Sequence, residues 1–324
     1  MLRRNTLRAL GLAAGALLLS PLAALAQDWP AKPIKIVVPY TPGGSSDIIA
    51  RAIATPLQEA LKQTVIVENR AGANGNTGTD LVAKSPADGY TLLLCDVGAL
   101  SITPSVYPKL PFDPSKDLAG VTMLAYSPHL LVVHPSVQAG NLKDLVALSK
   151  KSKIDFAVTA IGSAPHLAGV AVEKATAAQW AYIPYKGGSQ AINDTVAGQT
   201  HVLMNGMLAT LPFVKSGQLK VLGVSAEKRV ALLPEVPTIA EQGVSGFQSG
   251  TWQGVLVPAG TPSAVVQRLS AELTRIINTP EIRSRLAAQG ADVVTMTPPE
   301  FASFFARERK HWADVVAQGG VKIE

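Results

Sequence analysis

The chain has 324 residues, of which 47% are hydrophobic and only 16% are charged, a composition that excludes intrinsic disorder and allows one large core or two smaller ones. Its formal net charge is +6, and it has no dense run of basic residues interleaved with aromatic ones, which argues against nucleic-acid binding. Cys95 is the single cysteine, so an internal disulfide is excluded. Its apolar surroundings predict a buried side chain.

The first residues have the pattern of a secretory signal peptide. Arg3 and Arg4 precede an apolar run over residues 10–19, and residues 24–26 supply the small residues of a cleavage site. We therefore expect residues 1–26 to be removed after Ala26 and the mature chain to be periplasmic. The arginine pair leaves the Sec and the twin-arginine export routes open. The residue directly after the expected cleavage site is Gln27 and not a cysteine, so a lipid anchor is not expected.

From residue 33 onward, short apolar runs alternate with segments of helical periodicity. This alternation predicts parallel strands connected by helices that cover both faces of a sheet. The first predicted strands are residues 34–39, 65–67 and 91–94, with helices after residue 45 and over residues 79–84.

A second series of the same kind follows. Its predicted strands are residues 130–133, 156–159, 182–183, 202–204 and 219–224, and its helices are residues 142–149, 165–174, 190–197 and 209–216. A strand over residues 254–258 then precedes helices over residues 262–278, 280–289 and 298–318, each with proline near its start. The last helix carries aromatic residues at core spacing, namely Phe301, Phe304, Phe305 and Trp312.

These elements predict an α/β protein with two lobes. Each lobe is expected to be a mostly parallel sheet flanked by helices, with a ligand cleft between the lobes. We predict a discontinuous first lobe made of residues 27–125 and 247–324. Residues 126–246 are expected to form the second lobe.

Two glycine-rich loops follow the first two predicted strands, YTPGGSSD at residues 40–47 and NRAGANGNTGT at residues 69–79. Ligands bind at the carboxyl ends of strands in open α/β sheets, and the free N–H groups of a following helix favour an anion. The alternative is that both loops are ordinary turns. Neither contains G-x-G-x-x-G or Gly-Lys-Ser/Thr, which disfavours nucleotide binding.

The second lobe has matching loops at residues 160–166 and 185–189, so four helix N-termini are expected to meet at one cleft. Ser163 and His166 raise the alternative of a periplasmic hydrolase. However, the chain has no G-x-S-x-G elbow and no obvious third member for a triad. His129 and His134 are five residues apart on a predicted strand, a poor spacing for a metal pair. We expect no enzyme activity, no metal and no cofactor.

Several long sequence blocks occur in a distinctive order: WPAKPIKIVVPYTPGGSSDIIAR, VENRAGANGNTGTDLVAKSPADGYTLL, YIPYKGGSQAINDTVAGQ, WQGVLVPAGTP and TPPEFASFFARERKHW. Across essentially the whole expected mature chain, the sequence resembles the Bug (Bordetella uptake gene) family. Members of that family are the extracytoplasmic solute-binding receptors of tripartite tricarboxylate transporters.

The resemblance implies a type II-like periplasmic binding fold whose lobes close on a small organic carboxylate, such as a di- or tricarboxylate or an aromatic acid. It also implies a monomer that delivers this ligand to membrane permease subunits; presentation of the ligand to a sensor kinase is the alternative. The ligand-binding residues that it implies are Tyr40, Thr41, Gly43, Gly44, Ser45, Ser46, Asn74, Gly75 and Asn76 in the first lobe, and Gly162, Ser163, His166, Lys186, Asn205 and Met207 in the second.

One position departs from the family pattern. Asn205 stands where family members often carry an aspartate, so an anionic partner for a ligand amine is missing there. The resemblance then favours plain mono- or dicarboxylates over amino acids. Met204, Met207 and Leu208 either line an apolar subsite or pack in the core.

Overall fold

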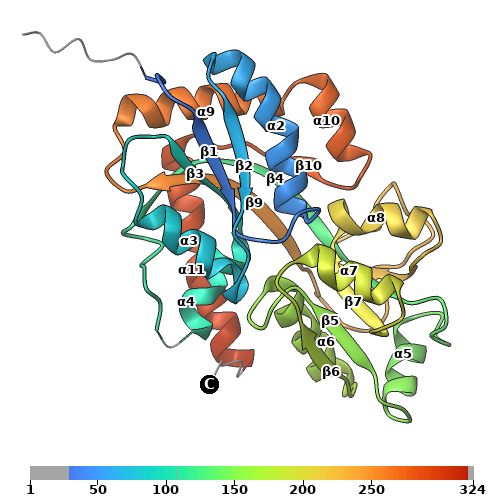
Figure 1. Ribbon diagram of the computed structural model, residues 1–324. Helices are drawn as coiled ribbons and strands as arrows, with labels where there is room; N and C mark the ends of the chain where they lie inside the picture. Colours follow the sequence, from blue (N-terminus) through green and yellow to red (C-terminus); the bar gives the residue numbers. More distant parts are fainter. Residues whose placement is uncertain (1–28, 108, 320–324) are drawn as a thin grey trace, which may run out of the picture. The chain divides into compact units, whose positions relative to one another are not determined.

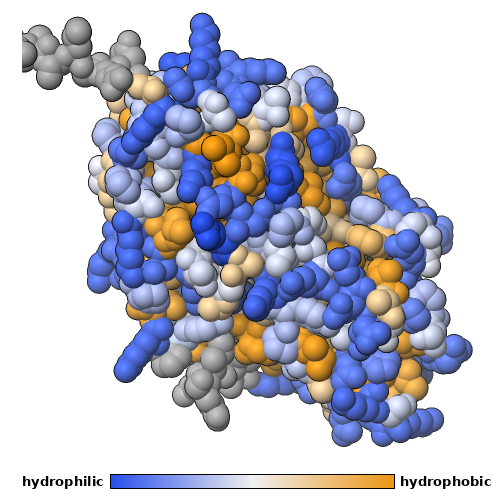
Figure 2. Space-filling view, in the orientation of Figure 1, coloured by the Kyte–Doolittle hydropathy of each residue, from blue (hydrophilic) through white to orange (hydrophobic). Residues whose placement is uncertain are grey.

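The computed structural model describes residues 29–107 and 109–319, and the described part of Lys32–Glu324 forms one compact unit (Figure 1). The expected signal peptide and its cleavage site lie outside the described residues. Within the described ranges, no helix is both long enough and apolar enough for a membrane span. The face in Figure 2 is mostly hydrophilic, and its hydrophobic side chains form separate patches.

The first strands form the parallel arrangement that the alternating pattern predicts. The central strand β1 (Ile34–Val38) pairs with β2 (Val65–Asn69) on one side and with β3 (Thr91–Asp96) on the other. The long helix α2 (Ser45–Leu61) follows β1. The short helix α3 (Asn76–Ala83) follows β2 and begins three residues earlier than predicted, because the polar loop residues themselves form its first turn.

A buried helical segment after β3 was not predicted. It consists of the π-turn η3 (Gly98–Ile102) and the short helix α4 (Thr103–Val106). All five residues of η3 are buried. Because such a segment has no solvent-exposed face, its sequence lacks the amphipathic periodicity by which surface helices are recognised.

Strand β4 (Leu118–Val133) belongs to both halves of the sheet. It is antiparallel to β9 (Gly250–Pro258) over Leu118–Pro128, and from His129 onward it pairs with β7 (Val202–Gly206). The predicted strand at residues 130–133 was therefore too short, because most of β4 is buried and does not alternate between apolar and polar residues. The limits of the two lobes stay a prediction, since β4 continues from one half into the other.

The second half repeats the alternation of strands and helices. Strand β5 (Asp155–Val158) is parallel to β6 (Ala181–Pro184) and to β7, whereas β8 (Lys220–Val224) is antiparallel to β4. The helices are α5 (Leu142–Ser149), α6 (Ala164–Thr176), α7 (Gly188–Val196) and α8 (Met207–Lys215). In Figure 1, β4 and β9 run between the two groups of elements.

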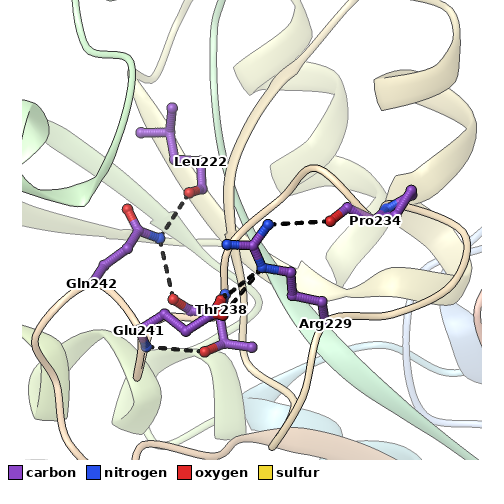
Figure 3. Close-up of polar contacts among 6 residues, drawn as sticks. All are labelled: Leu222, Arg229, Pro234, Thr238, Glu241 and Gln242. Carbon is purple, nitrogen blue, oxygen red and sulfur yellow. Dashed lines mark hydrogen bonds and ion pairs between the residues drawn. The ribbon is translucent and has the colours of Figure 1, made fainter.

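Polar contacts hold the long connection between β8 and β9, residues 225–249 (Figure 3). Arg229 Nε donates to Glu241 Oε2 at 3.0 Å, and the same carboxylate accepts from the Thr238 backbone N–H. Gln242 Nε2 donates to the backbone oxygen of Leu222 on β8 at 2.9 Å. These contacts fasten the connection to β8 and so help to fix where β9 begins.

The last elements pack against the first half of the sheet. They are α9 (Ser263–Ile277), α10 (Pro280–Ala287), the short strand β10 (Asp292–Val293) and α11 (Pro298–Gly319). Phe301 and Phe305 are buried, and Phe304 and Trp312 are partly buried against the same cluster, which confirms the predicted aromatic core. Cys95 is also buried as predicted.

Candidate functional site

A cavity lies between the two halves of the sheet, where the loops at the carboxyl ends of the parallel strands meet. The cavity is small: the volume open to the centre of a water molecule is about 30 Å³. The first half contributes Tyr40, Gly44, Ser45, Ser46, Asn74, Asp96, Val97, Gly98 and Thr251, and the second contributes Thr159, Ser163, Ala164, Pro165, Gly188, Asn205 and Gly206.

Four helices begin at this cavity. The first residues of α2, α6 and α7 line it, and Gly206, which lines it too, directly precedes α8. A helix N-terminus carries about half a positive charge and unpaired N–H groups, so four together attract an anion. Among the described residues that line the cavity, none is lysine or arginine. The attraction for an anion therefore comes from the backbone. The sequence predicted four such helices, but with α3 in the place of α8.

The first glycine-rich loop is held by Asp47. Its Oδ2 accepts from Gly43 N and from Arg51 Nε, both at 2.9 Å, and its Oδ1 accepts from Asn69 Nδ2 at 2.9 Å. Burial opposes ionisation, but the hydrogen bonds from Arg51, Gly43 and Asn69 keep the pKa of Asp47 below its ordinary value. Asp47 therefore positions the loop around the start of α2 and does not itself line the cavity.

The second loop depends on residues with positive φ. Asn74 has φ 53° and Gly75 has φ 88°. A Cβ atom at Gly75 would lie 2.9 Å from the Cβ of Ala99, so only glycine fits this turn. The turn directs Asn74 into the cavity, where its Oδ1 has no hydrogen-bond partner among the described residues. Asn74 is 4% exposed, so a ligand that donates a hydrogen bond to this oxygen would satisfy a buried polar atom.

The two halves touch each other around the cavity. The hydroxyls of Thr41 and Ser189 share a hydrogen bond of 2.8 Å, and Asn74 Nδ2 donates to the Gly162 backbone oxygen at 3.0 Å. Thr41 and Asn74 belong to the first half, whereas Gly162 precedes α6 and Ser189 lies in the first turn of α7 in the second half. The structure is therefore a closed arrangement of the two lobes.

Ser163 and His166 do not form a nucleophile–base pair. The Ser163 hydroxyl donates to the Ala160 backbone oxygen at 2.7 Å and accepts from the His166 backbone N–H, which makes it the N-cap of α6. His166 Nδ1 accepts from Gly162 N at 3.2 Å, so the imidazole supports the loop. An activated serine must donate its proton to a base, and here the proton goes to a carbonyl.

Seven of the predicted contact residues line the cavity, namely Tyr40, Gly44, Ser45, Ser46, Asn74, Ser163 and Asn205. Both ends of the Asn205 amide are used within the second half: Oδ1 accepts from Thr159 and Nδ2 donates to Thr210. The other predicted residues support the loops or bridge the halves without lining the cavity, namely Thr41, Gly43, Gly75, Asn76, Gly162 and His166. Lys186 is exposed outside the cavity.

Met204 and Met207 belong to the core, one of the two placements that the sequence left open. Met204 is 0% exposed and Met207 is 1% exposed. The side chain of Met207 also lines a separate surface hollow together with Tyr126 and Pro128. Since Met207 is the first residue of α8, its helix starts at the cavity while its side chain lies elsewhere.

The main residue that sequence reasoning missed is Asp96, the last residue of β3. Its Oδ1 accepts from the Tyr40 hydroxyl at 2.6 Å and from Gly98 N at 2.8 Å. Burial raises the pKa of Asp96 to about 6, although the hydrogen bonds from Tyr40, Gly98 and Ala99 oppose the shift. The signal in the sequence was the one acidic residue that ends the apolar run TLLLCD.

Two buried histidines make the fold sensitive to acid. His129 is 0% exposed, and its Nε2 lies 2.7 Å from the hydroxyl of Thr251 at the cavity. Burial lowers the pKa of His129 from 6.5 to about 3 and that of His166 to about 4. Between those values and pH 6.5, the unfolded chain binds protons that the folded chain does not.

We therefore predict that stability is fully present above pH 6.5 and is lost as the pH falls below it. Each histidine contributes a slope of up to about 1.4 kcal/mol per pH unit. Asp96 partly offsets this loss of stability below about pH 6. Its pKa is raised in the folded chain, so the folded chain binds a proton there before the unfolded chain does. Urea unfolding at pH 7.5, 6 and 5 measures how the free energy of unfolding changes with pH. Replacing His129 with asparagine should make this pH dependence weaker. A constant free energy of unfolding across this range in the wild-type protein would contradict the prediction.

Comparisons with known proteins agree with this geometry. Residues 49–321 match the family model described as tripartite tricarboxylate transporter family receptor. Over 302 residues the chain is 38% identical to protein BugT of Bordetella pertussis, an alignment that covers 92% of this chain and 93% of BugT.

Solved structures with the same fold include the periplasmic binding protein BugD, with a TM-score of 0.87 and 32% identity over 91% of this chain and 100% of BugD. Rpa4515 of R. palustris with adipate has a TM-score of 0.88 and 31% identity over 91% of this chain and 100% of that one. MatC of Rhodopseudomonas palustris with bound malate has a TM-score of 0.85 and 28% identity over 89% of this chain and 100% of MatC. These similarities confirm the predicted fold class, a two-lobed periplasmic binding protein.

Proposed function

The chain belongs to the tripartite tricarboxylate transporter receptor family, as its resemblance to the Bug family implied, and from this premise we propose that it captures a small organic carboxylate between its lobes. The observation that carries the proposal is the meeting of four helix N-termini at one closed cavity whose described lining includes no basic side chain. Such a site favours a small anion and offers it directional N–H donors.

The energetics are sufficient for this role. A hydrogen bond to a charged group contributes about 1.5–3 kcal/mol, and a micromolar dissociation constant requires about 8 kcal/mol. Four to six donors from the helix starts and from the hydroxyls of Ser45 and Ser46 supply about 6–18 kcal/mol before the cost of ordering, a range that includes the required value. The closed cavity is small, so a compact acid fits this arrangement better than a large aromatic one.

The proposed function includes export and delivery. We propose that cleavage after Ala26 releases a periplasmic monomer, and that residues 27–125 with 247–324 form one lobe while residues 126–246 form the other. In this proposal the closed, loaded receptor then presents its ligand to the permease subunits of a tripartite tricarboxylate transporter. Related structures contain adipate in Rpa4515 and malate in MatC, which supports a carboxylate as the cargo.

Isothermal titration calorimetry tests the capture step. Protein expressed as residues 27–324, refolded to remove any co-purified ligand, is titrated with di-, tri- and aromatic carboxylates and with the matching neutral amides. We expect micromolar or tighter binding of at least one acid and none of its amide. Native mass spectrometry of freshly purified protein identifies a retained acid by its mass. If none of the acids binds to protein that is confirmed as folded, the proposal is refuted.

A further inference from the structure

Asp96 places a carboxylate inside a site that otherwise attracts anions. Of the residues that line the cavity, only Asp96 and Tyr40 have titratable side chains, and Tyr40 donates its hydroxyl proton to Asp96. Burial raises the pKa of Tyr40 and that of the adjacent Cys95, so both of these groups are neutral at physiological pH. Within the described structure, no cation at the cavity neutralises Asp96.

Gln253 lies beside Asp96 on the neighbouring strand. In the antiparallel pair of β3 and β9, Asp96 is the direct partner of Gln253. Trp252 and Gly254 both lie against Phe301 of α11, so Gln253 and Thr251 point to the opposite face of the sheet. Thr251 and Asp96 line the cavity on that face, so Gln253 lies next to two lining residues without lining the cavity itself.

The amide of Gln253 is an unsatisfied buried group. Gln253 is 0% exposed, and neither its Oε1 nor its Nε2 has a hydrogen-bond partner among the described residues. A buried amide without hydrogen-bond partners lowers the stability of the folded chain, so packing alone does not explain a glutamine at this position. Asp96 lines the cavity and Gln253 lies beside it without lining the cavity itself; we call this pair the polar floor.

We propose, building on the proposed function, that Asp96 and Gln253 form a second subsite that selects ligands carrying a hydrogen-bond donor, a hydroxyl or an ammonium group, beside their carboxylate. The helix N-termini hold the carboxylate, and the polar floor accepts the donor. This subsite lies in the first half of the sheet, so it restores an anionic partner despite the asparagine at position 205. The family resemblance, with asparagine at position 205, favoured plain carboxylates; the subsite reverses that preference.

The hydrogen bonds around Asp96 explain why the subsite takes a donor and not a second carboxylate. Tyr40 and the backbone N–H groups of Gly98 and Ala99 all donate to Asp96, an arrangement that suits the ionised form. An ionised carboxylate accepts hydrogen bonds only, and it repels a second anion placed against it. A hydroxyl or ammonium group is attracted instead.

Matched acids test the selection. Succinate, malate and aspartate share one carbon skeleton and differ only in the donor, as do propionate, lactate and alanine. We expect the donor-bearing member of a series to bind the wild-type protein about tenfold to a hundredfold more tightly than the donor-free member. Malate against aspartate then distinguishes a hydroxyl from an ammonium group. In Asp96→Asn, this advantage should fall to about threefold or less, and the donor-free acid should bind more tightly than it does to the wild-type protein, because the repelling charge is gone.

Asp314→Asn is the matched control, because Asp314 is an exposed residue of α11 with a side chain that is 61% exposed. It removes the same charge from an exposed position that does not line the cavity, and it should not alter the ratio between the acids. Donor-free and donor-bearing acids that bind wild-type protein equally would overturn the subsite while leaving the proposed function in place. Binding of no acid in the wider panel would remove both.

Gln253→Met provides a second, independent variant. Methionine has a similar shape without the unsatisfied amide, so we expect the melting temperature to rise by about 2–5 °C. We also expect it to weaken binding of the donor-bearing acids. A lower melting temperature would show that the amide has stabilising partners in the protein, and it would exclude Gln253 from the subsite.

Discussion

Replacing Gly187 with alanine is expected to weaken ligand binding by about tenfold to a hundredfold while leaving the free protein folded. Gly187 has φ 171°, an extended conformation that alanine adopts without strain. A Cβ atom there would overlap the Thr41 hydroxyl and would lie 2.8 Å from the Thr41 backbone nitrogen. Thr41 belongs to the opposite lobe, so the collision arises only when the lobes close.

The magnitude follows from the cost of overpacking, about 1–3 kcal/mol, which falls on the closed state alone. A ligand that binds the closed state must then supply this extra free energy, and its apparent affinity drops accordingly. Calorimetry with the best acid of the panel measures the loss. Small-angle scattering should show that the wild-type protein becomes more compact on ligand addition and that the variant does so less completely.

Gly140→Ala is the control for this experiment. Gly140 is exposed in the second half of the sheet, and the only close neighbour of its added Cβ would be the flexible carboxylate of Asp144 at 3.3 Å. This variant should bind and compact like the wild type. Wild-type affinity and full compaction in Gly187→Ala would contradict the proposal that the ligand binds with Thr41 and Gly187 in close contact.

Replacing Phe301 with alanine is expected to lower the free energy of unfolding by about 3–5 kcal/mol. Phe301 is 0% exposed, and its ring packs edge-on against Trp252 with a centroid distance of 5.8 Å. It also fills the space beside Gly120 and Gly254 of the two central strands, where a Cβ atom would overlap the ring. Because backbone surrounds the ring, the cavity left by alanine cannot collapse easily.

Thermal and urea unfolding measure this loss, and a chain of this size should melt about 5–8 °C lower. Phe304→Ala is the control: Phe304 stacks on the same cluster, but it is only partly buried. It should lose clearly less stability, since part of its ring is already in water. Equal losses in the two variants would show that α11 is not anchored through Phe301.

The loops of the first half were predictable because their chemistry is local. The glycines and serines at residues 43–46 directly follow an apolar strand and precede an amphipathic helix, a pattern that indicates a strand, a turn and a helix N-terminus without any distant contact. Gly75 is predictable in the same way, since positive φ is a property of a single residue.

Residues that meet through strand pairing could not be predicted. Asp96 and Gln253 are 157 positions apart in the sequence, yet they are direct partners in the β3–β9 pair. Nothing in either segment specifies that β9 inserts between β3 and β4. The same reason explains why α8 was missed at the cavity: its start there depends on where β7 pairs with β4.

The sequence by itself determined the strand and helix alternation, the glycine turns and the aromatic core of the last helix, because each follows from periodicity or from the conformational range of single residues. Only the tertiary structure decided which loops share a cavity, and it placed a carboxylate in the lining of that cavity with an unsatisfied amide beside it. The physical reason is that strand order and lobe closure arise from burial of surfaces far apart in the chain, which no local pattern encodes.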